Sequence, residues 1–249
     1  MRGILFITMA SFLFLISCAS SSQFRTGKVY EKVVTHKVSD EDTWSSIAET
    51  YYGDIERAVQ LASYNGSDQG TVPEKGTGVK VPMTHRDIAG FEKRLEAVKK
   101  YNSGLDLASN GRFRDATGRF QEALKLNPSL SDASFNLAVT YQKLSLYKNA
   151  ATVLRALIVR EKENPEYFYA LGVSYFHMKE YKKAGISFLE ALSLNDCHLK
   201  SLFSLAVIHE KTGKDSEAEK CWERYLEISG EGEWAEEARF RLKSLRGQP

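Results

Sequence analysis

A period of 34 residues is the feature that most constrains the fold of this chain. Units can be started every 34 residues without insertion or deletion, at Ala97, Ser131, Pro165 and Leu199. We number the positions of each unit as slots, counted from its first residue. Slot 8 holds a small residue: Gly104, Ala138, Gly172 and Ala206. Slot 20 is always alanine: Ala116, Ala150, Ala184 and Ala218. Slot 24 holds a large apolar residue: Phe120, Leu154, Phe188 and Trp222. Small residues allow two antiparallel helices to approach closely, so the pattern predicts stacked helical hairpins.

This pattern resembles the tetratricopeptide repeat, a helix-turn-helix unit that stacks into a right-handed solenoid. The resemblance implies four repeats over 97–230, at 97–130, 131–164, 165–198 and 199–230. The last segment, 231–249, has an apolar face made by Trp234, Ala238, Leu242 and Leu245, with charged residues opposite. We expect it to form a capping helix, since the end of a solenoid needs a polar outer side.

Two further slots predict a ligand site on the array. Slot 5 holds Tyr101, Phe135, Tyr169 and Phe203, and slot 9 holds Leu105, Val139, Val173 and Val207. In the family these slots face the concave surface, so the resemblance implies a strip that binds a protein or peptide partner. Buried aromatic rings dominate the energetics of such interfaces. The alternative is that these side chains fold back into the core between helices.

The stretch 33–82 carries a second pattern. It opens with a β-branched run that predicts a strand. Asp42 or Thr43 can then cap a helix, because a short side-chain oxygen accepts from its free backbone N–H groups. Gly53 ends this helix and a second one follows, after which the alternating run 79–81 predicts a closing strand.

The order β-α-α-β, the Asp-Thr pair, the Tyr-Gly-Asp extension and the final Val-x-Val-Pro resemble a LysM module. The resemblance implies that a glycan containing N-acetylglucosamine, such as peptidoglycan, binds in a shallow groove between two loops. The corresponding positions are Ser39, Asp40, Asp42, Thr43 and Trp44 in the first loop, and Asn65, Gly66, Thr71, Val72 and Pro73 in the second. Short polar side chains suit such a ligand because it needs oriented hydrogen bonds. Asp42 and Thr43 can instead act only as caps, and Trp44 can pack inward instead of stacking on a sugar.

The N-terminus predicts export. Arg2 precedes a 13-residue apolar-rich run from Ile4 to Ile16, which is too short to span a bilayer and is typical of a signal peptide. The run Leu-Ile-Ser-Cys that ends at Cys18 resembles the bacterial lipobox. The resemblance implies that 1–17 is removed and that Cys18 is acylated. The alternative is an ordinary signal peptide with an incidental cysteine.

Anchoring by Cys18 would place the rest of the chain close to a lipid surface. Residues 18–32 are then the lipidated N-terminus and a linker, 33–82 the LysM module, and 83–96 a linker or leading helix. Ala19 after the cysteine indicates the outer membrane, facing the periplasm, in a source with two membranes. Several acyl chains hold firmly, whereas one alone is marginal.

Composition and spacing exclude other classes of function. A formal charge of +2 argues against binding to nucleic acid. The five histidines show no metal-binding or catalytic spacing, so we expect no enzyme, metal or cofactor. Cys197 and Cys221 occupy different slots and are expected to stay thiols, although a disulfide is the alternative in an oxidising compartment.

The sequence therefore predicts a mainly α protein, in which a small β-α-α-β module precedes a helical solenoid. The first functional hypothesis is a lipid-anchored envelope protein that binds peptidoglycan and scaffolds a protein partner. The second is an assembly scaffold whose LysM-like module no longer binds sugar. Glu41 and Trp44 motivate the second, because the LysM family usually has Gly and Leu there.

Overall fold

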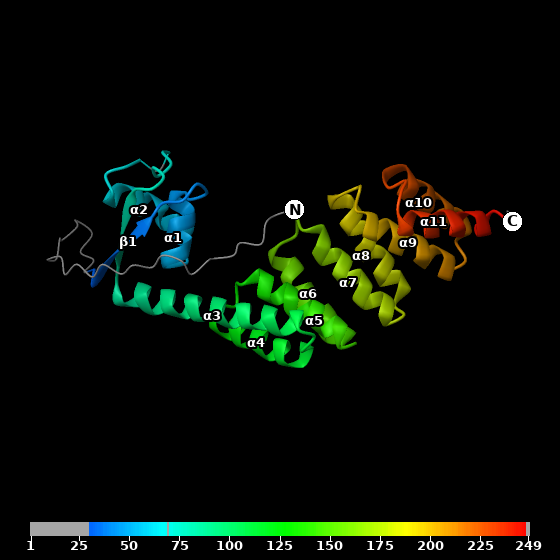
Figure 1. Ribbon diagram of the computed structural model, residues 1–249, viewed down its shortest axis with the longest axis horizontal. Coiled ribbons are helices and arrows are strands. Elements are labelled where there is room, and N and C mark those ends of the chain that lie inside the picture. The colour runs from blue at the N-terminus through cyan, green and yellow to red at the C-terminus, as the bar shows by residue number, and fades with distance from the viewer. Residues whose placement is uncertain (1–29, 69, 248–249) are drawn as a thin grey trace. The chain divides into compact units, whose positions relative to one another are not determined.

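The computed structural model describes residues 30–68 and 70–247. The signal segment and Cys18 lie outside these residues. The chain divides into two compact units, with the boundary between Glu92 and Lys93. Among the described residues, the strands lie in the first unit, and the regular elements of the second unit are helices (Figure 1). The mainly α fold class expected from the sequence is thus observed.

The N-terminal unit has the expected β-α-α-β order, with a short 3-10 helix before the second α-helix. Its elements are β1 (Lys32–Lys37), α1 (Trp44–Tyr52), η1 (Ile55–Arg57), α2 (Ala58–Tyr64) and β2 (Gly78–Met83). The two strands pair antiparallel, with Val34 opposite Val81. The first two turns of the long helix α3 (His85–Ser109) also belong to this unit, where Ile88 and Phe91 pack against the core of the unit.

The caps of α1 account for where this helix begins and ends. Thr43 is the N-cap: its side chain accepts a hydrogen bond from the backbone of Ser46, and the Ser46 side chain accepts one from the backbone of Thr43. Gly53 ends the helix with a φ of 68°. Between these caps, Trp44, Ile47, Ala48 and Tyr51 are buried. Of the two predicted caps, the structure therefore uses Thr43.

The C-terminal unit is a stack of antiparallel helix pairs (Figure 1). The rest of α3 supplies the first helix. The others are α4 (Phe113–Leu126), α5 (Ser131–Lys143), α6 (Tyr147–Arg160), α7 (Pro165–His177), α8 (Tyr181–Leu194), α9 (Leu199–Lys211), α10 (Asp215–Ile228) and α11 (Glu233–Leu245). The stretch 83–96, predicted as a linker or leading helix, continues without interruption into the first repeat, because α3 runs for 25 residues. Between 85 and 97 the sequence has no proline and a single glycine, Gly90, which a helix tolerates.

The turn inside each helix pair repeats with the same period as the sequence. Slot 15 has a positive φ in every unit: 73° at Gly111, 59° at Ser145, 61° at Lys179 and 68° at Gly213. The N–H of slot 16 donates to the carbonyl of slot 11 in all four units, at 2.8 to 2.9 Å. This is the Schellman arrangement that ends a helix with a left-handed residue. Two of the four turns hold that conformation without glycine.

Slots 8, 20 and 24 form the inside of each hairpin, as predicted. The four slot-20 alanines are fully buried, and the slot-24 side chains are at most 1% exposed. In α11, Ala235, Ala238 and Leu242 are buried. Trp234 departs from the predicted apolar face, because its side chain is 62% exposed while its ring meets the Phe203 ring edge-on.

Candidate functional site

The first predicted glycan loop is held by the Asp42 carboxylate. Asp42 Oδ2 accepts hydrogen bonds from the backbone N–H and hydroxyl of Ser39, both at 2.7 Å, and lies 3.0 Å from Nε2 of His36. Partial burial raises the pKa of Asp42, but these hydrogen bonds outweigh it and the pKa lies below its ordinary value. The carboxylate therefore fixes the loop, so one of its two oxygens is already engaged.

Two of the predicted glycan residues are turned inward. Trp44 is only 4% exposed and belongs to the hydrophobic core of the N-terminal unit. Stacking of Trp44 on a sugar ring is thus wrong, and its alternative, inward packing, is what the structure shows. Pro73 is buried as well, so its ring offers no surface to a ligand. Both side chains are apolar or mostly apolar, and the small unit buries them because it has few other residues with which to build a core.

The side-chain amide of Asn65 is hydrogen-bonded to backbone groups of the N-terminal unit. Its Nδ2 donates to the carbonyls of Leu61 and Lys80, and its Oδ1 accepts from the Lys80 N–H at 2.8 Å. These three bonds join the end of α2 to β2. An asparagine that satisfies backbone groups in this way has no free donor for a sugar. We therefore correct the predicted role of Asn65 from ligand contact to positioning of β2.

The remaining predicted residues are on the surface. Ser39, Asp40, Thr43, Gly66, Thr71 and Val72 are exposed. Asp40 pairs with Lys75 at 2.6 Å, and the backbone of Val38 bonds to Gly76 and Thr77. The first loop is thus joined to the part of the second loop nearest β2. A glycan surface here would rest on hydroxyls and backbone amides.

The predicted aromatic strip consists of Tyr101, Phe135, Tyr169 and Phe203, and all four side chains are half-buried. In the first, third and fourth repeats, the slot-5 ring packs against the slot-24 ring: centroids are 5.9 Å apart for Tyr101 and Phe120, 5.8 Å for Tyr169 and Phe188, and 4.8 Å for Phe203 and Trp222. Each of these rings has one side fixed by the core and part of its surface open to solvent.

The strip also makes contacts with the following repeat. Asn136 Nδ2 donates to the Tyr101 hydroxyl at 3.1 Å, and the Phe135 ring lies 5.2 Å from that of Tyr167. The slot-9 residues Leu105, Val139, Val173 and Val207 are half-buried too. The two sequence alternatives, ligand strip and core, are therefore not exclusive. Rings held in this way are preorganised, which lowers the ordering cost of binding.

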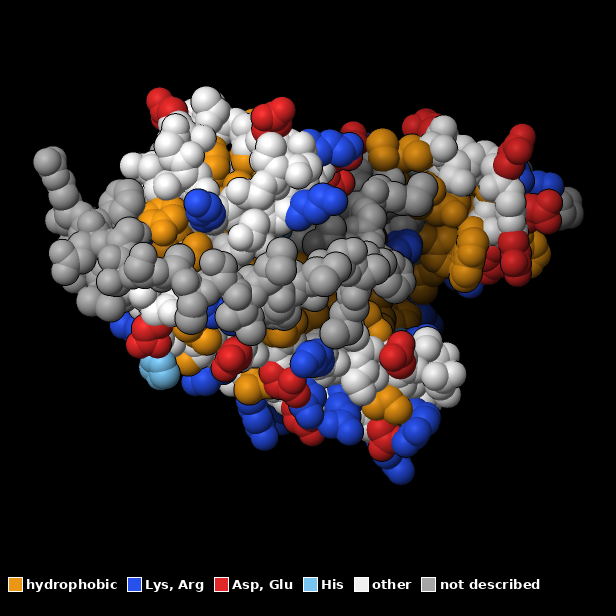
Figure 2. Space-filling view, turned by 60° about the vertical axis from the view of Figure 1, so that its left-hand side comes forward, with side chains coloured by type: hydrophobic (Ala, Val, Ile, Leu, Met, Phe, Trp, Pro, Cys, Tyr) orange, Lys and Arg blue, Asp and Glu red, His pale blue; other side chains and the backbone are white. Residues whose placement is uncertain are grey.

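The described residues give no sign of another chemistry. Within 30–68 and 70–247, no group of three metal-ligating side chains lies together, and no helix is both long and apolar enough to cross a membrane. Cys197 and Cys221 are free thiols. Basic and acidic side chains are mixed on the face shown in Figure 2, as the small formal charge leads us to expect.

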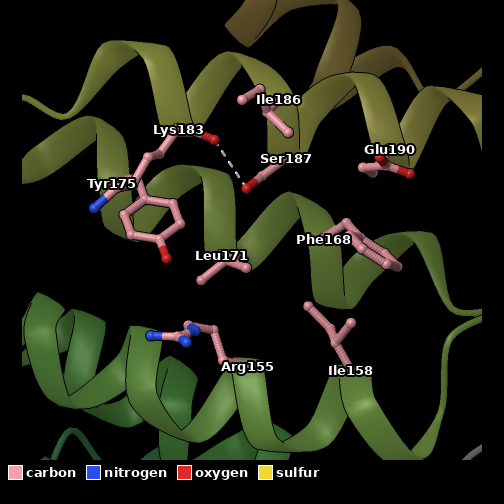
Figure 3. A pocket seen from close by; sticks show the side chains of 9 residues that line it. All are labelled: Arg155, Ile158, Phe168, Leu171, Tyr175, Lys183, Ile186, Ser187 and Glu190. Carbon is pink, nitrogen blue, oxygen red and sulfur yellow. Dashed lines mark hydrogen bonds between the residues drawn. The ribbon is translucent and has the colours of Figure 1, made fainter.

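The sequence reasoning missed one feature of the array, a groove bounded by α6, α7 and α8 (Figure 3). The sequence feature that could have predicted this groove is at slot 22. Ile186 occupies this slot in the third repeat, whereas the other repeats have Gly118, Thr152 and Lys220. An apolar residue there breaks the pattern of an exposed helix face.

Comparisons with known proteins agree with the geometry of the array. Residues 101–157 and 135–196 match the family described as "Tetratricopeptide repeat". The TPR repeat-containing protein MJ1428 of Methanocaldococcus jannaschii is 30% identical over 187 residues, which cover 74% of this chain and 32% of that protein. The chain thus spans about a third of the length of the curated relative that it matches.

Solved structures show the same fold at low sequence identity. The MamA protein superposes with a TM-score of 0.56 at 20% identity, over 61% of this chain and 82% of MamA. YrrB, described as a TPR protein with an unusual peptide-binding site, gives 0.54 at 20% identity, over 65% of this chain and 81% of YrrB. Residues 101–196 thus match tetratricopeptide repeats, and the C-terminal unit has the fold of proteins built from them.

Proposed function

We propose that this protein is a lipid-anchored adaptor of the bacterial cell envelope. Its N-terminal unit binds peptidoglycan, and its tetratricopeptide array holds a protein partner beside the wall. The observation that carries the proposal is the aromatic strip, in which one ring per repeat is anchored on one side and open on the other. The protein is proposed to act by binding and scaffolding, without catalysis.

The strip suits an extended or helical peptide. Its rings recur every 34 residues, once per helix pair, so successive side chains of a ligand can meet successive repeats. Interface hot spots are enriched in aromatic side chains that lie in well-packed surroundings, and half-buried rings provide these. The slot-9 aliphatic residues widen the apolar surface beside each ring.

A photo-crosslinking experiment tests the strip. The photoreactive amino acid benzoylphenylalanine is placed at Phe135 or Tyr169 in the full chain, and at Phe240 as a control, because Phe240 is an aromatic residue with 69% exposure outside the strip. Positions 135 and 169 should capture the same partner in native cells, and position 240 should not. If no partner is shared by 135 and 169 in chains with normal circular dichroism, the strip is not the binding site.

The glycan half of the proposal is supported by the resemblance to LysM modules and by the β-α-α-β order of the elements. After the corrections above, the proposed contacts are Ser39, Thr43, Gly66, Thr71 and Val72, with Asp40 and Asp42 at the edge. Gly66 and Gly76 have open space where a Cβ would lie, so a ligand can come close to the backbone there. Binding would be weak, since the surface is shallow and polar.

The anchor rests on sequence alone, because Cys18 is outside the described residues. Cys18→Ser should abolish acylation and release the protein from the membrane fraction. Mass spectrometry of the wild-type N-terminus should find a lipid-modified cysteine at position 18. An unmodified mature N-terminus at another residue would contradict both the lipid anchor and the proposed location at the outer membrane.

A second candidate function is an envelope scaffold whose N-terminal unit contacts protein instead of sugar. The contacts of three side chains within the N-terminal unit favour this candidate. Asp42 and Asn65 are hydrogen-bonded inside the unit and Trp44 is in its core, so they offer little to a glycan. The two candidates differ in one observable, which is co-sedimentation with insoluble peptidoglycan.

A further inference from the structure

The groove between α6, α7 and α8 has an apolar floor and open ends. Its volume is about 380 Å³, within the range of about 300–1,000 Å³ that ligand pockets usually have. Phe168, Leu171 and Tyr175 of α7 form the floor, while Ile158 of α6 and Ile186 of α8 stand on opposite walls (Figure 3). Ile186 is 52% exposed. The array thus leaves an isoleucine in solvent beside an unfilled apolar surface.

The corresponding position one repeat earlier is closed by a hydrogen bond. There, Gln121 at slot 25 donates from Nε2 to the hydroxyl of Tyr141 at slot 11, at 2.9 Å, and Tyr141 is buried. In the groove the same two slots hold Arg155 and Tyr175, for which the described part of the chain provides no such bond, and Tyr175 is half-exposed. Slot 4 also changes, from Ser134 to the bulky Phe168. The groove therefore arises from side chains particular to this boundary.

Charge is distributed unequally along the groove. Arg155 and Lys183 lie at the same end as Tyr175, whereas Glu190 lies at the opposite end, near Phe168 (Figure 3). The Lys183 ammonium is paired with Glu180, the residue that precedes α8, and lies 5.4 Å from the centroid of the Tyr175 ring. Arg155 forms no ion pair with any residue in the described ranges. A guanidinium beside an apolar floor is a binding point for a carboxylate.

We infer that this groove binds a short peptide segment of a partner protein, with two adjacent apolar side chains on the floor and an acidic side chain against Arg155. The segment lies with its acidic end toward Lys183 and any basic residue toward Glu190, which follows from the placement of these charges. An apolar segment is required because only apolar side chains benefit from contact with Phe168, Leu171 and Ile186.

This site is separate from the aromatic strip. Successive residues of a helix project about 100° apart, so slots 4, 7 and 11 of α7 face the groove while slots 5 and 9 lie on another side. Tyr169 and Val173 belong to the strip and do not line the groove. Both sites can therefore be occupied at once, and the groove does not depend on the proposed role of the strip.

The test starts from a random heptapeptide library displayed on phage and selected against the full chain. Selected peptides should share two neighbouring apolar residues and one acidic residue. Their binding is then measured by fluorescence polarisation. Arg155→Glu and Ile186→Glu should each weaken binding about tenfold or more, because they oppose the carboxylate or place a charge on the apolar wall.

Matched controls separate this site from general effects. Lys220→Glu introduces the same residue at slot 22 of the fourth repeat, on α10, and should alter binding less than twofold. A peptide with lysine in place of its acidic residue should regain affinity for Arg155→Glu. All three substituted positions are exposed, and circular dichroism confirms that each variant is folded. Selection of peptides without the acidic–apolar pattern, equal binding to Arg155→Glu and Ile186→Glu, or no recovery with the lysine peptide would each overturn the proposal.

Discussion

Gly172→Ala should destabilise the array through a single aromatic ring. A Cβ at this position would lie 2.5 Å from Cε1, 2.7 Å from Cδ1 and 2.9 Å from Cζ of Phe188. That ring is 1% exposed and packs against Tyr169 on one side, so it cannot retreat freely. Overpacking of a core costs about 1–3 kcal/mol, and the higher helix propensity of alanine offsets about 1 kcal/mol of this. We expect a net loss of up to about 2 kcal/mol.

The second repeat indicates how the loss can be reversed. It pairs Ala138 with Leu154 at the same two slots, and both side chains are buried. Phe188→Leu alone should cost about 1–2 kcal/mol through the space that it leaves. In that background Gly172→Ala should become neutral or stabilising, so the two substitutions should show a coupling free energy of about 1–3 kcal/mol.

Urea unfolding followed by circular dichroism measures this cycle. Gly118→Ala is the matched control, since it lies within α4, where an added Cβ meets nothing within 4 Å. It should stabilise by about 0.5–1 kcal/mol. If Gly172→Ala were as stabilising as Gly118→Ala, or if its effect did not depend on residue 188, the close approach of α7 to Phe188 would be wrong.

Other predictions concern the turns and the N-terminal unit. Lys179→Gly should raise the melting temperature, because a side chain in the left-handed region costs about 1–2 kcal/mol, whereas Lys182→Gly inside α8 should lower it. Asn65→Ala should destabilise the N-terminal unit by about 1–3 kcal/mol in urea titrations, because it leaves the Lys80 N–H without its acceptor. Acid should weaken the same unit, since the folded pKa values of Asp42 and Asp87 lie below 3.8. Their contribution is complete above that pH and is lost as the pH falls through the folded values, which unfolding curves from pH 6 to pH 2 would reveal.

The repeat period predicted the array well because helix pairing depends on a few side-chain volumes. Alanine at slot 20 and large residues at slot 24 can be read directly from the sequence, and the structure buries both sets. The left-handed backbone conformation of slot 15 was harder to predict from the sequence. Glycine signals it at Gly111 and Gly213, but Ser145 and Lys179 adopt the same φ only because their repeats impose it.

The candidate sites were harder to predict because one side chain can serve either fold or ligand. Asn65 and Trp44 occupy positions that the LysM resemblance assigns to the groove, yet their hydrogen bonds and burial are decided by tertiary contacts with β2 and the core. The α6–α8 groove was missed for a related reason. It needs Phe168, Ile186 and Arg155 from three helices to meet, which the period alone does not reveal.

Co-sedimentation with purified, insoluble peptidoglycan tests the central claim most directly. The full chain with Cys18→Ser, which removes the proposed lipid site, is compared with the same chain carrying Thr71→Trp and Val72→Trp, two exposed positions of the proposed glycan surface. The account predicts that the first protein sediments with the wall, that soluble N-acetylglucosamine oligomers release it, and that the second stays in solution while folded. Failure of the first protein to sediment would contradict glycan binding, and the N-terminal unit would then be a protein-contact module.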